Sequence, residues 1–105
     1  MIAAEMETAG YVYILTNKPF GTLYIGVTSD LSQRVLQHRS RAVPGFTRDY
    51  NCTRLVWCER FESIHDARAH ERRMKKWQRA WKVARIVEQN PEWRDLFEDG
   101  LIPRG

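Results

Sequence analysis

The chain has 105 residues, a length that supports one domain with a single hydrophobic core and no need for disulfide or metal staples. Its 43% hydrophobic and 29% charged residues are typical of a soluble globular protein, and no stretch approaches the roughly 18 apolar residues that cross a membrane. The net charge of +4 is unevenly distributed: residues 60–85 carry nine basic side chains against three acidic ones, and acidic residues dominate from Ile86 onward. This pattern favours a polyanion-binding face, although a solvated helix face explains it equally well.

Residues 10–98 are expected to form the domain, with a flexible N-terminal leader at 1–9 and a C-terminal tail at 99–105. The leader is too short and too acidic for a signal peptide, so a cytoplasmic location is the default. Cys52 and Cys58 lie on or beside one predicted strand, where six residues span roughly 20 Å, and this distance exceeds disulfide reach. Their spacing matches no zinc motif, so we expect reduced thiols.

Two strands joined by a hairpin are predicted near the start of the chain. Residues 11–15 and 22–28 are rich in aromatic and β-branched side chains, and residues 17–21 contain three turn formers. Alternation along the second strand places Tyr24 on the same face as a glycine. An even loop length would set Tyr13 opposite Tyr24 on that face.

A helix is predicted to follow the hairpin, because Asp30 with Gln33 three residues later is a capping-box pattern. Helical spacing then places four side chains on one stripe: Leu31, Arg34, Val35 and His38. Half of this stripe is polar, although it faces the core. An arginine and a histidine beside two strand tyrosines predict a polar pocket.

Residues 40–51 read as a loop containing glycine and proline, with the basic residues Arg41 and Arg48 and the aromatic residues Phe46 and Tyr50. A basic loop with interleaved aromatic rings can bind phosphates and stack on bases. The alternative is that the two rings only pin the loop to the core. We favour pinning for the rings and phosphate contact for Arg48.

A third strand is predicted over residues 53–61, with Leu55 and Trp57 on one side and Val56 and Cys58 on the other. Because neither side of this segment is uniformly apolar, we expect partial burial on both.

Ser63 is expected to begin a helical stretch that continues to about Gln89, with a bend or a break at residues 77–79. Pro91 ends this stretch, and residues 92–98 are expected to form a final turn or short helix.

Glu71 is the most informative residue of the second helical region. It shares one helical face with five mostly apolar side chains: Ile64, Ala67, Met74, Gln78 and Trp81. An unpaired buried carboxylate costs several kcal/mol or becomes neutral, so Glu71 requires a partner. The candidates are Arg34, in a structural ion pair, and a bound cation.

The ordered set of these residues resembles the GIY-YIG nuclease domain. The matching residues are Tyr11-Val12-Tyr13, then Tyr24-Ile25-Gly26 after ten intervening residues, then Arg34 and His38. The first triad departs from the family's name, since Tyr11 stands where glycine is usual and Val12 where isoleucine is. Over residues 10–96 the chain also resembles small stand-alone bacterial members, through Gly45-Phe46-Thr47, Tyr50-Asn51, Leu55-Val56, Glu71, Lys75-Lys76-Trp77 and Asn90-Pro91-Glu92-Trp93.

The resemblance implies an α/β (α+β) fold, with a small three-stranded, mainly antiparallel sheet flanked by helices. It also implies a metal-dependent, structure- or strand-selective endonuclease that hydrolyses phosphodiester bonds of DNA, with RNA as the alternative, in DNA repair or processing. One Mg²⁺ or Mn²⁺ ion would bind Glu71, Tyr13 and Tyr24 would be the catalytic tyrosines, and Arg34 would bind the scissile phosphate. A tyrosine base titrates near 10, so it needs the metal or another cation to lower its pKa.

His38 has two interpretations, a catalytic residue that relays a proton or orients a tyrosine, and a packed hydrogen-bonded residue. Helix termination is a sufficient role for Asn90. The basic residues expected to contact nucleic acid are Arg41, Arg48, Arg72, Lys75, Lys76 and Arg79.

Two other functions remain open. A non-catalytic nucleic-acid-binding module that retains the fold would bind in a salt-sensitive manner without turnover. A protein-interaction domain would use the polar pocket structurally, and Glu71→Ala would then cost about 3–5 kcal/mol of stability. No separate DNA-binding module is evident, so selectivity would come from shape, the basic face, a homodimer or a protein partner. No strongly amphipathic terminal helix supports a membrane role.

Overall fold

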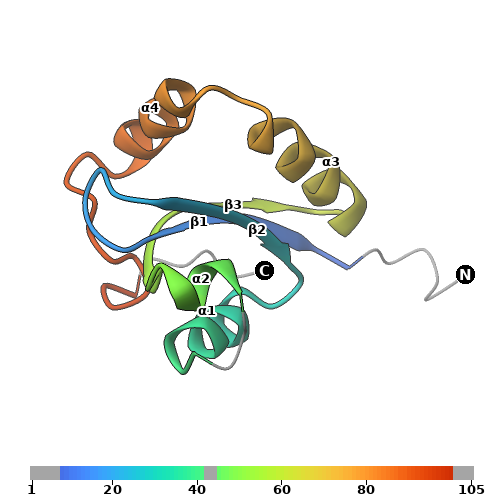
Figure 1. Cartoon of the computed structure of the whole chain (residues 1–105). Coiled ribbons are helices and arrows are strands. Elements are labelled where there is room, and N and C mark those ends of the chain that lie inside the picture. The colour runs from blue at the N-terminus through green and yellow to red at the C-terminus, as the bar shows by residue number, and fades with distance from the viewer. Residues whose placement is uncertain (1–7, 42–44, 101–105) are drawn as a thin grey trace, which may run out of the picture.

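Three antiparallel strands form one sheet in the order β2-β1-β3, with helices on both of its faces (Figure 1). The computed structural model describes residues 8–41 and 45–100. The elements are β1 (Gly10–Thr16), β2 (Leu23–Thr28), α1 (Leu31–Arg39), α2 (Phe46–Asp49), β3 (Arg54–Phe61), α3 (Ile64–Lys75) and α4 (Arg79–Gln89). The predicted α+β fold is confirmed, and the predicted leader and tail lie mostly outside the described residues. In the part of the chain that the structure describes, no helix is long and apolar enough to cross a membrane.

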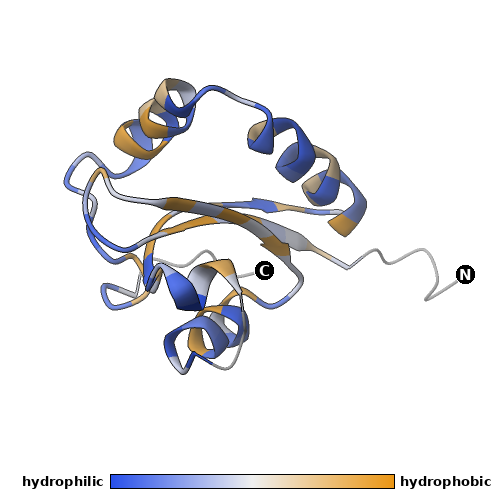
Figure 2. Ribbon diagram, viewed as in Figure 1, coloured by the Kyte–Doolittle hydropathy of each residue, from blue (hydrophilic) through white to orange (hydrophobic). Residues whose placement is uncertain are grey.

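The central strand β1 is buried along its whole length because α3 and α4 cover one face of the sheet and α1 and α2 the other (Figure 1). Val12 and Ile14 belong to the core on the α3 and α4 side, and Tyr11, Tyr13 and Leu15 to the core on the α1 side. Figure 2 shows hydrophobic segments in the strands, whereas α3 is mostly hydrophilic. The α3 helix therefore presents a polar surface beside an apolar sheet.

The hairpin register differs from the prediction by two residues. Tyr13 pairs with Gly26, and Tyr24 pairs with Leu15, because the connection spans residues 17–22. An added Cβ on Gly26 would lie 2.5 Å from Cζ of Tyr13, so this register needs a glycine opposite the tyrosine ring. Because the shift is even, Tyr13 and Tyr24 stay on one face, with ring centroids 6.3 Å apart.

The predicted alternation of β3 is wrong, and the reason is a bulge. Leu55 and Trp57 pair with the consecutive residues Leu15 and Ile14, which leaves Val56 as the extra residue. Both Val56 and Trp57 consequently belong to the core on the α3 and α4 side. Residues 55–58 are all buried, instead of partly buried, since helices or the C-terminal segment cover both faces of this strand.

The predicted helix starts and the predicted break are confirmed. Asp30 accepts a hydrogen bond of 3.2 Å from the backbone of the first turn of α1, and Ser63 caps α3 in the same way. The helical stretch breaks after Lys75 and resumes at Arg79. This break turns Trp81 out of the predicted buried stripe, and 57% of its surface is exposed. The predicted loop at 40–51 contains the short helix α2.

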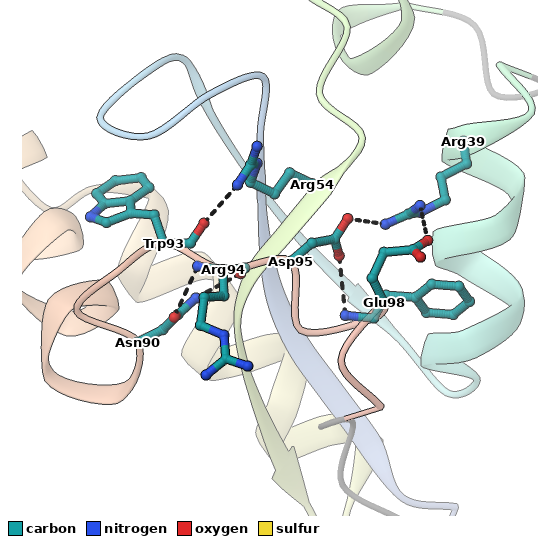
Figure 3. Close-up of polar contacts among 8 residues, drawn as sticks. Arg39, Arg54, Asn90, Trp93, Arg94, Asp95 and Glu98 are labelled. Carbon is teal, nitrogen blue, oxygen red and sulfur yellow. Dashed lines mark hydrogen bonds and ion pairs between the residues drawn. The ribbon is translucent and has the colours of Figure 1, made fainter.

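The C-terminal segment ties α4, β3 and α1 together (Figure 3). The buried Asn90 side chain donates to a backbone carbonyl of β3 at 3.1 Å and to one in the following turn at 2.8 Å. Arg54 donates to the carbonyl of Trp93 at 3.0 Å, and Arg39 forms ion pairs with Asp95 and with Glu98. Asn90 caps the end of α4, in agreement with the predicted role in helix termination. Residues 92–98 contain turns and no helix, so the first of the two predicted alternatives is confirmed.

Candidate active site at the edge of the sheet

Tyr13 is the centre of a polar cluster inside the domain. Its side chain is 1% exposed, and its hydroxyl lies 3.1 Å from Nε2 of His38. The charges of Arg34 and Glu71 also act on this hydroxyl. Two helices on opposite faces of the sheet, α1 and α3, therefore place polar groups around one residue of β1.

Burial sets the protonation state of Tyr13. Burial, together with the neighbouring Tyr24 and Glu71, raises the pKa of the hydroxyl to about 12, although Arg34 opposes the shift. The hydroxyl is therefore protonated at neutral pH and can donate a hydrogen bond.

His38 bridges two hydroxyl groups. Its Nε2 faces Tyr13, and its Nδ1 lies 3.0 Å from Oγ1 of Thr47 in α2. Burial, reinforced by the charge of Arg34, lowers the pKa of His38 to about 4. The neutral ring has one donor nitrogen and one acceptor nitrogen, which the two hydroxyls satisfy.

Thr47 is a member of the cluster that the sequence did not single out for a role. Its side chain is 4% exposed, whereas Phe46 and Tyr50 on either side are 44% and 54% exposed. The prediction that the two aromatic rings pin the loop to the core is therefore wrong, because Thr47 is the residue of α2 that anchors it. The Gly45-Phe46-Thr47 triplet was a usable signal, since it belongs to the motifs that carry the resemblance.

Tyr24 and Arg34 form the partly exposed rim of the cluster. The Tyr24 ring centroid lies 5.6 Å from that of His38, and Nη1 of Arg34 donates to Oε1 of Gln37 at 3.0 Å. The guanidinium keeps further donors available next to Tyr13, because it has five N–H groups in a planar fork. An anion at this rim would meet a fixed positive charge.

Glu71 contributes the carboxylate of the site from α3. It is 9% exposed, and its Oε2 lies 2.5 Å from Nζ of Lys75, one turn further along the helix. The side chain that pairs with Glu71 is therefore Lys75 and not Arg34, the structural partner that the sequence analysis named. The Lys75 side chain is 52% exposed, so one member of the pair has free access to solvent.

The other predicted nucleic-acid contacts lie outside this cluster. Arg41 is bound to the carbonyl of Arg48 at 3.1 Å, and Arg79 donates to two carbonyls of the β1–β2 turn at 2.8 Å each. Arg48, Arg72 and Lys76 are exposed. Among the predicted basic residues, the structure brings Lys75 to Glu71 and leaves these five on the surrounding surface.

Comparisons with known proteins match this arrangement. The family model described as the GIY-YIG catalytic domain covers residues 9–84, which include Tyr13, Tyr24, Arg34, His38 and Glu71. The chain belongs to the GIY-YIG family. This domain defines a superfamily of nucleases, which act on nucleic acids and generally depend on a divalent metal.

Several small GIY-YIG relatives match over most of their length. A UPF0213 protein of Bacillus pumilus is 31% identical over 83% of this chain and 89% of its own, and one of Clostridium perfringens is 36% identical over 76% and 85%. The solution NMR structure of a UPF0213 protein from Bacillus halodurans has a TM-score of 0.52 and 29% identity, and covers 83% of this chain and 92% of that one. The fold of this chain therefore agrees with that of the small UPF0213 proteins.

The donor groups suit the divalent metal on which GIY-YIG nucleases generally depend. Within residues 8–41 and 45–100, no three His, Cys, Asp or Glu side chains gather as a metal cluster. Mg²⁺ does not need such a cluster, because it commonly binds one or two carboxylates and keeps several waters or phosphate oxygens. The ammonium group at 2.5 Å from Oε2 of Glu71 shows that this carboxylate is positioned against a cation. The residues present fit the ion.

Proposed function

We propose that this protein is a divalent-metal-dependent endonuclease that hydrolyses phosphodiester bonds of DNA, with RNA as the second candidate polymer, in DNA repair or processing. The single observation that carries the proposal is the polar cluster at Tyr13, where His38 lies 3.1 Å from the hydroxyl, the Tyr24 ring lies 6.3 Å away, and the charges of Arg34 and Glu71 act. Phosphodiester hydrolysis needs an activated water, positive charge at the phosphorus and help for the leaving oxygen. The cluster contains a group suited to each need.

Glu71 would hold the Mg²⁺ or Mn²⁺ ion, with waters and phosphate oxygens as the remaining ligands. When bound, such an ion supplies charge stabilisation at the phosphate and lowers the pKa of water. Lys75 leaves Oε2 of Glu71 in this state, which its half-exposed side chain permits. The freed ammonium group stays near the site and can pair with a phosphate oxygen.

Tyr13 and His38 form a route for the proton of the attacking water. In one tautomer of His38 the proton is on Nδ1, which donates to Thr47, and Nε2 is free to accept a proton. Nε2 then takes the hydroxyl proton of Tyr13, while the Tyr13 oxygen takes a proton from the attacking water. Arg34 lowers the pKa of His38 by its charge. A phosphate bound to Arg34 offsets that charge, so substrate binding makes His38 a better proton acceptor.

The exposed basic residues around the cluster would hold the remaining phosphates without reading sequence. They are Arg41, Arg48, Arg72, Lys75, Lys76 and Arg79. Arg79 already donates to a backbone carbonyl of the β1–β2 turn, so we expect it to contribute least to binding. Discrimination among substrates would then come from shape, or from a homodimer or protein partner.

The test compares wild type, Glu71→Gln and the matched control Glu88→Gln, which alters an exposed carboxylate of α4. Each protein is incubated with labelled single-stranded, duplex, flap and branched DNA and with RNA, in Mg²⁺, Mn²⁺ or EDTA. We expect the wild type and Glu88→Gln to cut at least one substrate, and both EDTA and Glu71→Gln to abolish cutting. Cleavage that persists in Glu71→Gln would overturn the proposed metal ligand.

A second candidate, a non-catalytic nucleic-acid-binding module, is favoured by the Glu71–Lys75 ion pair itself, because that pair already satisfies the carboxylate. This candidate predicts salt-sensitive binding, equal in wild type and Glu71→Gln, with no cutting of any substrate. The same set of reactions therefore decides between the two functions.

A further inference from the structure

A groove lies beside the candidate active site, at the start of the edge strand β2. Its volume is about 290 Å³, and four elements line it through Leu23, Tyr24, Ile25, Phe46, Lys75 and Lys82. Lys75 connects the groove to Glu71, and Tyr24 connects it to Tyr13 and His38. Whatever binds in the groove is thus adjacent to the proposed reacting phosphate.

Phe46 gives the groove an exposed aromatic wall. Its ring stacks on Tyr24, with centroids 6.1 Å apart and planes inclined by 30°, and its other neighbour is Tyr50 at 4.7 Å. With 44% of its surface exposed, Phe46 is poorly explained as a core residue. Aromatic side chains that are exposed next to positive charge are the typical platform for single-stranded nucleic acid, because every base has a π-face.

The two lysines restrict the class of ligand. Lys75 and Lys82 come from different helices, α3 and α4, and both line the same small space as Phe46. A planar apolar ring attached to a phosphate matches this combination of an aromatic wall and two ammonium groups. The volume is at the lower end of the roughly 300–1,000 Å³ of small-molecule sites, which suits one base with its sugar and excludes a stacked duplex.

We propose that the groove binds one unstacked nucleobase of the substrate strand, next to the scissile phosphate, with its ring against Phe46 and its phosphate between Lys75 and Lys82. This inference rests on the proposed function, and it deepens it by requiring an unpaired nucleotide on one side of the cut. A free single strand, a flap and a frayed end all supply such a nucleotide, whereas the interior of a duplex does so only after unpairing.

The other end of β2 differs from the groove, and this difference predicts on which side of the cut a base is recognised. A second pocket of about 240 Å³ is formed there by Thr8, Val27, Thr28, Ser29, Ile64 and Arg68. It includes an arginine and hydroxyl groups, but no aromatic ring among its lining residues. This pocket suits a phosphate and offers no platform for a base, so recognition of a base is expected on one side of the cut alone.

Binding is tested first, in EDTA at fixed ionic strength, by the fluorescence anisotropy of one labelled oligonucleotide as a single strand and as a duplex, in DNA and RNA forms. The variants are Phe46→Ala and Lys82→Ala, with Trp81→Ala as the matched control, because Trp81 is also an exposed aromatic residue but lines a different pocket. We expect Phe46→Ala to weaken single-strand binding by about 5- to 100-fold, the range of one lost base stack, and to change duplex binding less than 2-fold. Trp81→Ala should match the wild type.

The directional claim is tested with cleavable single strands that contain one abasic site at successive positions. We expect wild-type cleavage to fall when the missing base lies on one side of the cut, and Phe46→Ala to be insensitive to its position. Unchanged single-strand binding in Phe46→Ala, or equal sensitivity on both sides, overturns the subsite while leaving the nuclease intact. Nucleic-acid binding by the wild type with no cutting at any site contradicts the proposed function, and the anisotropy result then still decides the groove.

Discussion

The two halves of the candidate active site are held in place by different kinds of interaction. On the α1 side, Tyr13, His38 and Thr47 are almost fully buried and hydrogen-bonded in a chain. On the α3 side, Glu71 is held by an ion pair whose lysine is half exposed. A buried network is preorganised and costly to disturb, whereas a partly exposed ion pair contributes little stability and can change partner. Under the proposed function, the first half couples activity to stability, and the second exchanges its lysine for a metal ion.

The largest expected effect is that of Tyr13→Phe, which removes one hydroxyl from the buried half and keeps the ring. We expect cleavage to fall by about 10²- to 10⁴-fold, the usual contribution of acid–base catalysis, while stability falls by about 1–3 kcal/mol because His38 loses a partner. Steady-state cleavage and urea unfolding measure the two losses. Tyr50→Phe, which alters an exposed tyrosine of the α2 region, is the control and should change neither.

The pH dependence of stability sharpens the same contrast. The pKa of His38 is lowered from 6.5 to about 4, so the unfolded chain binds a proton before the folded protein does. Neutral His38 therefore makes its full contribution to the free energy of unfolding above pH 6.5. This contribution, up to roughly 3 kcal/mol, is lost as the pH falls toward 4. Urea unfolding of wild type and His38→Gln between pH 8 and pH 4 isolates this slope as the difference between the two curves. If the stability of both proteins changed equally with pH, the lowered pKa of His38 would be contradicted.

Gly26→Ala tests how tightly the buried half is packed. The new Cβ would lie 2.5 Å from Cζ of Tyr13, so the ring must move away from its hydrogen bonds. We expect a loss of about 1–3 kcal/mol in the free energy of unfolding, together with loss of cleavage. In a Tyr13→Leu background the ring is absent, and the same glycine substitution should then cost measurably less. An equal cost in both backgrounds would show that the glycine is needed for another reason.

The smallest expected effect concerns the Glu71–Lys75 ion pair on the α3 side of the site. Lys75→Gln removes the ammonium group from Glu71, and Mn²⁺ binding without nucleic acid should tighten by about 2- to 5-fold, the equivalent of a surface ion pair. Isothermal titration calorimetry measures this affinity. Lys76→Gln removes the same charge from the next residue, which is exposed and does not pair with Glu71, and it should leave the affinity unchanged. Equal affinities in both variants would contradict an exchange of lysine for metal.

Errors in the sequence analysis occurred where contacts between distant segments decide the outcome. Local signals located both hairpin strands, the Asp30 and Ser63 caps and the break between α3 and α4. The hairpin register depended on the space that the Tyr13 ring takes over Gly26, and the bulge in β3 depended on its neighbour β1. Neither contact has a signal in the local sequence, because both join segments separated along the chain.

The sequence by itself determined which side chains are available for chemistry, through the tyrosine pair on the first two strands, the polar stripe of α1 and a carboxylate on an apolar helix face. These are local patterns of spacing and side-chain type, which a strand or a helix converts directly into a shared face. The tertiary structure alone decided the long-range partners. It joined His38 to Thr47 and placed Phe46 and Lys82 in one groove, whereas the Glu71–Lys75 pair follows from i, i+4 spacing on one helix. Partner choice depends on how helices cross the two faces of the sheet, and that is a property of the whole packed core.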